Sequence, residues 1–149
     1  LLAQLSRLKR SITVAGTHGK TTTSSMAGWI LEKAKLKPTV IVGGEIRNVR
    51  ASAFWGVGDL FVLETDESDG SFLETLPWIA IATNVDNDHL DHYGSMRRLK
   101  EAFITHLNTV PFYGWAILCK DDPVLSNEIL PHLRCPAGRR NQGHLNAPI

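Results

Sequence analysis

Gly16-Thr17-His18-Gly19-Lys20-Thr21-Thr22-Thr23 decides the fold of this chain, because it links a short apolar run to an amphipathic segment. Glycines at a strand-to-helix turn let backbone N–H groups face an anion, and the start of the helix adds the positive end of its dipole. Lys20 can supply a charge for the β- and γ-phosphates of a nucleotide, and the Thr21 hydroxyl can hold Mg²⁺. The stretch therefore predicts a phosphate-binding loop, with these candidate nucleotide-binding residues: Gly16, Thr17, His18, Gly19, Lys20, Thr21 and Thr22.

The loop departs from the usual phosphate-loop pattern at one position. That pattern has a glycine five residues before its second glycine, where this chain has Val14. The match is to a shorter variant, Gly-Thr-x-Gly-Lys-Thr. An ordinary strand-to-helix turn is the alternative, but such a turn does not require a lysine and three threonines.

Composition sets the class of protein. A chain of 149 residues forms about one domain with a real core. A formal net charge of +1 gives no electrostatic argument for a nucleic-acid or membrane-surface partner. No apolar run approaches the ~20 residues of a membrane span. Two cysteines without metal-ligand spacing favour a reducing cytoplasm.

Apolar patterning predicts strands that alternate with helices. Short runs rich in Val, Ile and Leu are typical of strands buried on both faces, and they cover 11–15, 39–42, 60–64, 79–83 and 115–119. Helical spacing marks residues 21–36, with Met26, Ala27, Ile30, Leu31 and Ala34 toward the core, and a second helix from Met96 to Val110. Asp122-Pro123 is typical of a third helix start. The order predicts an α/β fold, a three-layer phosphate-loop domain with a mostly parallel sheet.

Unusual polar residues follow three of the predicted strands, where ligands of an open α/β sheet gather. The first strand ends in the glycine-rich loop, the strand 60–64 ends in Glu64, and the strand 79–83 leads into Asn84 and His89. A carboxylate at the end of a buried strand, beside a phosphate site, is a good Mg²⁺ ligand. For Glu67 and Asp69 taken alone, a solvated loop is the simpler interpretation.

The histidines allow other interpretations. His89-Leu90-Asp91-His92 matches the end of a metal-hydrolase pattern, His-x-His-x-Asp-His, but Asn87 stands where the first histidine is needed. For His92, capping the loop before the next helix is the simpler role. His106, His132 and His144 have no partners in sequence and are expected at the surface.

Together these segments resemble the central, ATP-binding domain of the Mur ligases of bacterial peptidoglycan synthesis. The resemblance covers about residues 2–133 and rests on residues 16–23, Glu-Thr-Asp-Glu-Ser-Asp-Gly-Ser-Phe-Leu (64–73), Thr-Asn-Val-Asp-Asn-Asp-His-Leu-Asp-His-Tyr (83–93), Pro-Phe-Tyr-Gly (111–114) and Asp-Asp-Pro (121–123). The acidic motif favours the alanine-adding branch. The related murein-peptide recycling ligase has tyrosine where Ser68 stands.

The resemblance implies an ATP- and Mg²⁺-dependent ligase that joins L-alanine to UDP-N-acetylmuramate through an acyl phosphate. It implies that Lys20 steadies the β- and γ-phosphates, that Thr21 and Glu64 hold one Mg²⁺, and that His89 helps to hold a second. Imidazole is not a typical Mg²⁺ ligand, so the role of His89 rests on the family alone. The candidate catalytic residues are Lys20, Glu64 and His89, and the candidate substrate-binding residues are Asp66, Glu67, Ser68 and Asn84.

The resemblance also divides the chain. Residues 1–10 are expected to be a helix end or linker from a missing N-terminal domain, 11–134 an incomplete central domain truncated at its C-terminal side, and 135–149 an irregular tail. The family's N-terminal domain for the UDP group and C-terminal domain for the amino acid are both expected partners. Two other functions stay open, a nucleotide-binding module without catalysis of its own and the recycling ligase.

Overall fold

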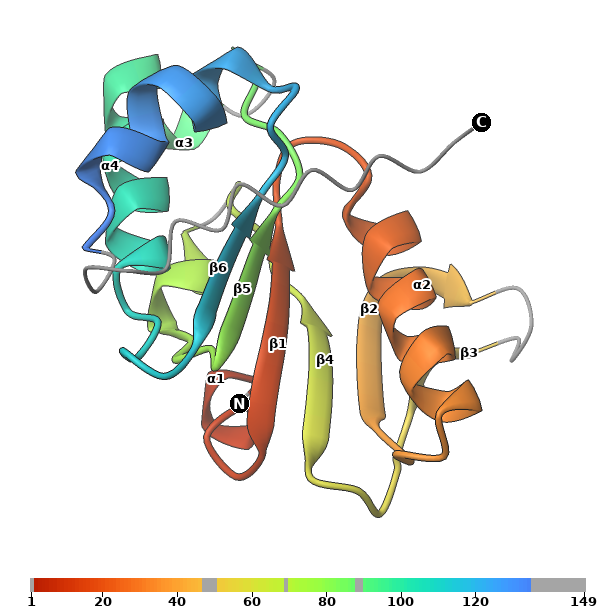
Figure 1. The fold of residues 1–149 in the computed structure, drawn as a ribbon. Coiled ribbons are helices and arrows are strands. Elements are labelled where there is room, and N and C mark those ends of the chain that lie inside the picture. Colours follow the sequence, from red (N-terminus) through yellow and green to blue (C-terminus); the bar gives the residue numbers. More distant parts are fainter. Residues whose placement is uncertain (1, 47–50, 69, 88–89, 135–149) are drawn as a thin grey trace, which may run out of the picture.

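A six-stranded sheet forms the centre of the molecule (Figure 1). The computed structural model describes residues 2–46, 51–68, 70–87 and 90–134. The strands lie in the order β3-β2-β4-β1-β5-β6, and every neighbouring pair is parallel except β2 and β3. The predicted α/β fold with a mostly parallel sheet is therefore confirmed.

The elements follow the predicted alternation along most of the chain. The strands are β1 (Arg10–Ala15), β2 (Thr39–Ile46), β3 (Ala51–Phe54), β4 (Leu60–Glu64), β5 (Ile79–Ala82) and β6 (Trp115–Leu118). The helices are α1 (Leu2–Leu5), α2 (Lys20–Lys33), α3 (Leu90–Tyr93) and α4 (Met96–Leu107), with short turns η1 (Ser71–Glu74), η3 (Leu125–Ile129) and η4 (Leu130–His132). Within the described residues, no helix combines the length and apolar character needed to cross a membrane.

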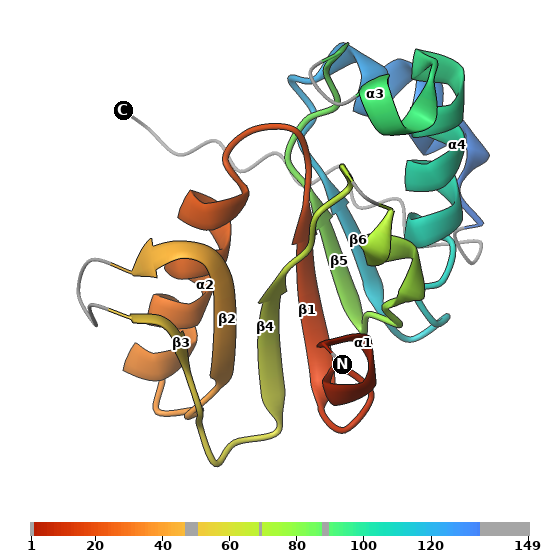
Figure 2. The same ribbon diagram turned by 180° about the vertical axis from the view of Figure 1, so that it is seen from behind.

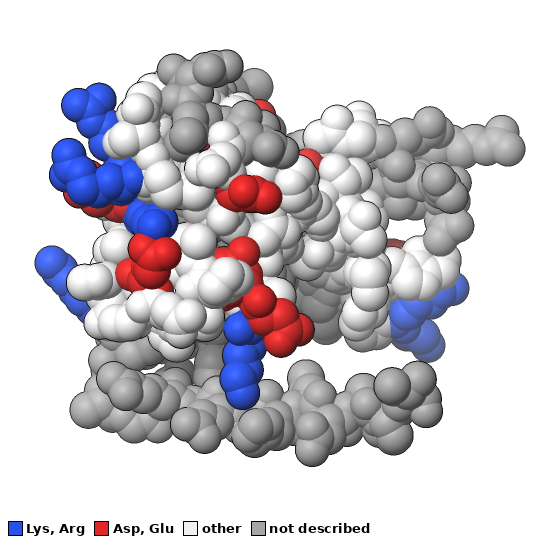
Figure 3. All heavy atoms as spheres, turned by 90° about the horizontal axis from the view of Figure 1, so that it is seen from above, with Lys and Arg blue, Asp and Glu red and all other residues white. Residues whose placement is uncertain are grey.

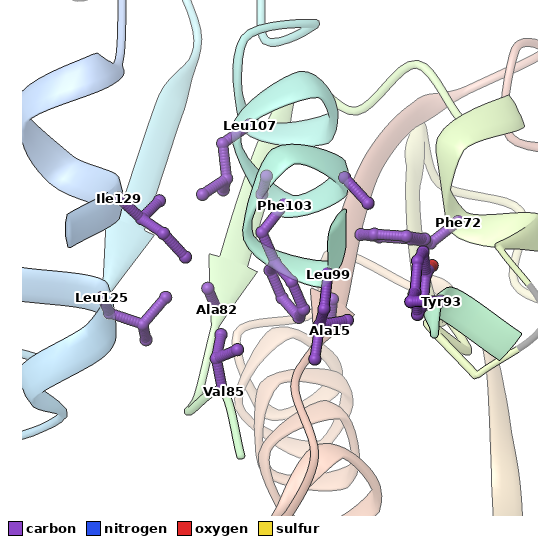
Figure 4. Packing of buried hydrophobic residues seen from close by; sticks show 12 residues of the cluster. Ala15, Phe72, Ala82, Val85, Tyr93, Leu99, Phe103, Leu107, Leu125 and Ile129 are labelled. Atoms are coloured by element: carbon purple, nitrogen blue, oxygen red, sulfur yellow. The ribbon is translucent and has the colours of Figure 1, made fainter. Parts of the chain in front are cut away.

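Two apolar clusters lie on opposite faces of the sheet. The fold therefore has three layers, with the sheet between α2 and α4. On β5, Ala80 and Ala82 belong to the cluster under α4, while Ile79 and Ile81 pack with the cluster under α2. Successive side chains of a strand point to opposite faces, so the two clusters lie on the two sides. Figures 1 and 2 show the same division, with α2 on one face and α4 and η1 on the other. Leu99 and Phe103 of α4 lie at the centre of the larger cluster (Figure 4).

The predicted core face of α2 is wrong in part. Met26 and Ile30 are 59% and 60% exposed, whereas Ser24 and Gly28 are buried. Gly28 approaches the sheet so closely that a Cβ there would lie 2.9 Å from a Val40 methyl carbon. Small residues therefore face the sheet, with Ala27 and Leu31 packing beside them. Hydrophobic spacing does not reveal a contact made by glycine and serine.

Other elements also differ from the sequence prediction. The antiparallel strand β3 was not predicted, and it pairs with β2 at the edge of the sheet. The segment after Asp122 begins as predicted, because the Asp122 carboxylate accepts a hydrogen bond from the Leu125 N–H at 2.7 Å. It continues through η3 and η4 rather than as a regular α-helix.

The expected surface position of His106 is wrong. This α4 side chain is fully buried, with Nε2 3.3 Å from the Thr13 hydroxyl of β1 and its ring 4.9 Å from that of Phe72. Burial lowers the pKa of His106 from 6.5 to about 4, and the backbone of Phe72 opposes the shift only in part. His106 is therefore neutral inside the core at pH 7.

We predict that the chain loses stability as the pH falls from 6.5 toward 4. In this window the unfolded chain binds a proton on His106 that the folded chain excludes, so the free energy of unfolding falls by about 3 kcal/mol in total. Urea unfolding of the wild type and His106→Gln at pH 7 and pH 4.5 measures the effect. The variant should show a clearly smaller drop, and equal drops in both proteins would contradict the assignment.

Candidate functional site

The site lies where β1 runs between β4 and β5. All three strands are parallel, so their carboxyl ends meet at one edge of the sheet. From β1 the chain passes to α2 and β2 on one side, and from β4 it passes to β5 on the other. Where the connections of neighbouring strands run to opposite sides of the sheet in this way, a crevice for ligands opens between the strand ends. Figure 3 views the molecule from this end, with acidic side chains near its centre and Lys and Arg mostly toward its margins.

Two glycines shape the predicted phosphate loop. Gly16 has φ +137°, and a Cβ there would lie 2.0 Å from the Thr83 hydroxyl oxygen, so only glycine fits. Gly19 has φ +79° and is the N-cap of α2, without a side-chain cap hydrogen bond. The first N–H groups of a helix have no partner within the helix. The N–H groups of Lys20, Thr21 and Thr22 therefore suit an anion.

The segment after β5 braces the loop. The Asn84 amide accepts from the His18 N–H at 2.8 Å and donates to the His18 carbonyl at 2.9 Å, and the Thr17 N–H donates to the Asn84 carbonyl at 3.2 Å. The Thr17 hydroxyl accepts from the Asp86 N–H at 2.9 Å. These groups hold the loop in shape. Their roles in nucleotide or substrate binding stay predictions.

Thr21 and Glu64 meet as predicted. The Thr21 hydroxyl donates to Glu64 Oε1 at 2.9 Å, and Glu64 Oε2 accepts from the Gly43 N–H at 2.7 Å. Two oxygen ligands of one Mg²⁺ lie at most ~4 Å apart, so this pair fits a single ion. Among the described residues, no group of three or more His, Cys, Asp or Glu side chains is placed to hold a metal. One hydroxyl and one carboxylate still suit Mg²⁺, which takes its other ligands from phosphates and water.

Lys20 pairs with a carboxylate that the sequence suggested would be solvated. Its Nζ lies 3.0 Å and 3.1 Å from the two oxygens of Glu67, and it also donates to the Gly16 carbonyl at 2.7 Å. The Glu67 side chain is fully buried, so its interpretation as a solvated loop residue is wrong. Its partner Lys20 lies 47 residues away in the sequence, so no local pattern marked Glu67 as buried.

The remaining acidic and histidine residues that the sequence singled out are not brought together with Lys20, Thr21 and Glu64 among the described residues. Asp66 is exposed and accepts from the Ser68 N–H at 2.8 Å in a local turn. His92 is exposed at the end of α3. His89 and Asp69 lie outside the described residues, so the predicted place of His89 beside Glu64 stays a prediction.

Sequence comparison decides the family. Residues 14–134 match the Mur ligase middle domain. The chain belongs to the Mur ligase family. It is 50% identical over 133 residues to UDP-N-acetylmuramate–L-alanine ligase of Endomicrobium trichonymphae, covering 89% of this chain and 29% of that protein. The chain thus spans about 29% of the length of this curated relative.

Solved structures of Mur ligases share the fold. UDP-N-acetylmuramate:L-alanyl-gamma-D-glutamyl-meso-diaminopimelate ligase from Neisseria meningitides matches with a TM-score of 0.78 at 29% identity, over 87% of this chain and 45% of that one. UDP-N-acetylmuramate-alanine ligase from Thermotoga maritima matches with a TM-score of 0.72 at 32% identity, over 83% of this chain and 28% of that one. Both support the α/β phosphate-loop architecture of the Mur ligase middle domain.

We predict that Gly16→Ala destabilises the chain far more than Gly94→Ala. Both glycines have positive φ, but a Cβ at Gly16 meets Thr83 and the Asn84 backbone, whereas at Gly94 it meets nothing within 4 Å. Backbone strain of this kind costs about 1–3 kcal/mol, and the collision at Gly16 adds to it. Urea unfolding of both variants compares them directly. Equal losses of stability would show that the loop is not fitted tightly against the segment after β5.

Proposed function

We propose that this chain is the ATP-binding part of a cytoplasmic ligase that joins L-alanine to UDP-N-acetylmuramate in peptidoglycan synthesis. The observation that supports this proposal most strongly is the contact of Thr21 with Glu64, directly beside Lys20 at the start of α2. Family membership and the name of the relative at 50% identity support the choice of reaction. The substrates and partner domains belong to the proposal, because the chain spans a minor part of the relatives.

Each residue has a role in this proposal. ATP transfers its γ-phosphoryl group to the substrate carboxylate, the L-alanine amine attacks the resulting acyl phosphate, and phosphate leaves as the amide forms. Lys20 binds the β- and γ-phosphates, and the N–H groups at the start of α2 hold phosphate oxygens. Thr21 and Glu64 would hold Mg²⁺, which supplies charge neutralisation. His89 is proposed for a second Mg²⁺ on the family resemblance alone.

The two remaining candidate functions make different predictions. A nucleotide-binding module binds ATP without transferring its phosphoryl group. The recycling ligase releases phosphate with a murein peptide as the amine-side partner rather than with L-alanine. Phosphate release by a longer protein that contains this chain, measured with L-alanine and with the peptide, separates these functions. The proposal expects release only with UDP-N-acetylmuramate and L-alanine together.

We predict that Lys20→Ala raises the Kd for Mg²⁺–ATP at least about tenfold, because charge-assisted hydrogen bonds to phosphate are lost. Calorimetry on the 149-residue chain measures the change. Lys33→Ala is the matched control, since it removes the same charge from the last turn of the same helix. It should leave the Kd within about twofold, because helix-dipole and phosphate contacts are confined to the first turn. Equal affinities of Lys20→Ala and the wild type would exclude the phosphate loop.

A further inference from the structure

Glu67 holds Lys20 in one position. Both Glu67 carboxylate oxygens contact the ammonium group, at 3.0 Å and 3.1 Å, and the Gly16 carbonyl accepts from it at 2.7 Å. Lys20 is 15% exposed and Glu67 is 0% exposed. A buried carboxylate without a partner is costly, so this ion pair is strongly favoured in the folded chain.

The backbone of Glu67 is anchored to the core on the α4 side. Its carbonyl accepts from the Tyr93 hydroxyl at 2.6 Å and from the Gly70 N–H at 3.1 Å. Tyr93 belongs to the larger apolar cluster, as does Phe72 in the turn that follows. These contacts fix the backbone of Glu67, and its buried carboxylate lies against Lys20.

The pairing sets the charge that a nucleotide meets. Lys20 contributes +1, and Glu64 and Glu67 contribute −1 each, so these three side chains sum to −1. A nucleoside triphosphate without a bound cation brings several more negative charges to the phosphate loop. Because Glu67 already compensates the charge of Lys20, a cation bound with the nucleotide would offset the remaining repulsion.

We propose that Glu67 is a positioning residue that fixes Lys20 and makes this site select the cation-bound nucleotide over the free one. The inference rests on the proposed function, because it takes the loop to be a phosphate site. Glutamine at position 67 keeps the shape and one acceptor oxygen but removes the charge. Free ATP should then bind more tightly, while Mg²⁺–ATP gains nothing, since Lys20 is held less firmly.

The test compares the Kd of ATP in EDTA with the Kd of ATP in excess Mg²⁺, on the 149-residue chain. The ratio of the two constants reports cation selectivity, and a purely structural role would change both constants together. Removing one nearby charge from a partly dehydrated site is expected to lower the ratio about fivefold in Glu67→Gln. Glu67→Asp, which keeps the charge but draws it back from Lys20, should lower the ratio about twofold.

Controls separate the possible failures. Glu74→Gln removes an exposed carboxylate from the neighbouring turn η1 and should leave the ratio unchanged. An unchanged ratio in folded Glu67→Gln would overturn the inference. If that variant does not fold, as judged by thermal melting, an unchanged ratio in Glu67→Asp would overturn it instead. If Lys20→Ala leaves both constants unaltered, the proposed phosphate site itself fails, which is a different result from an unchanged ratio.

Discussion

The parallel pairing of β1 with β4 on one side and β5 on the other is the constraint on which the site depends. In this register Val14 lies opposite Glu64 and Ile81, and Ala15 lies opposite Ala82. The Thr65 N–H and the Thr83 N–H continue the two ladders to the Val14 and Ala15 carbonyls. A slip of one residue would send every side chain to the other face. The register therefore brings Glu64 and Asn84 to the glycine-rich loop.

At this edge of the sheet, two neighbouring segments hold the loop in place. The end of β4 and the segment after it contact the start of α2 twice, through Glu64 with Thr21 and Glu67 with Lys20. The segment after β5 binds the other half of the loop through Asn84. Groups already held in place bind phosphate and metal with little further ordering. The arrangement fits a site that works by positioning and charge neutralisation.

Much of this architecture could be predicted from the sequence, because its signals are local. The bounds predicted for β4 match those of the structure, since a continuous apolar run ends there at a carboxylate. The proximity of Thr21 and Glu64 followed from a general property of parallel sheets, that their strand ends meet at one edge. The prediction needed the glycine-rich loop and a carboxylate at the end of a buried strand, but not the order of the strands in the sheet.

Three of the wrong predictions concern contacts between residues that are apart in the sequence. Glu67 and His106 have partners 47 and 93 residues away, so no local pattern marks them as buried. The buried face of α2 depends on how closely Gly28 approaches Val40, which periodicity does not reveal. Buried polar pairs of this kind become visible only when the strand order and the layers are known.

Electron paramagnetic resonance of Mn²⁺ used in place of Mg²⁺ tests the central claim most directly, that Glu64 and the phosphate loop form one metal–nucleotide site. With the 149-residue chain and ATP, the bound Mn²⁺ should show phosphorus couplings and a spectrum distinct from Mn²⁺–ATP in buffer. Glu64→Gln should weaken Mn²⁺–ATP binding about tenfold, because a carboxylate ligand is lost. A spectrum identical to that in buffer, or unchanged affinity in the variant, would contradict the account.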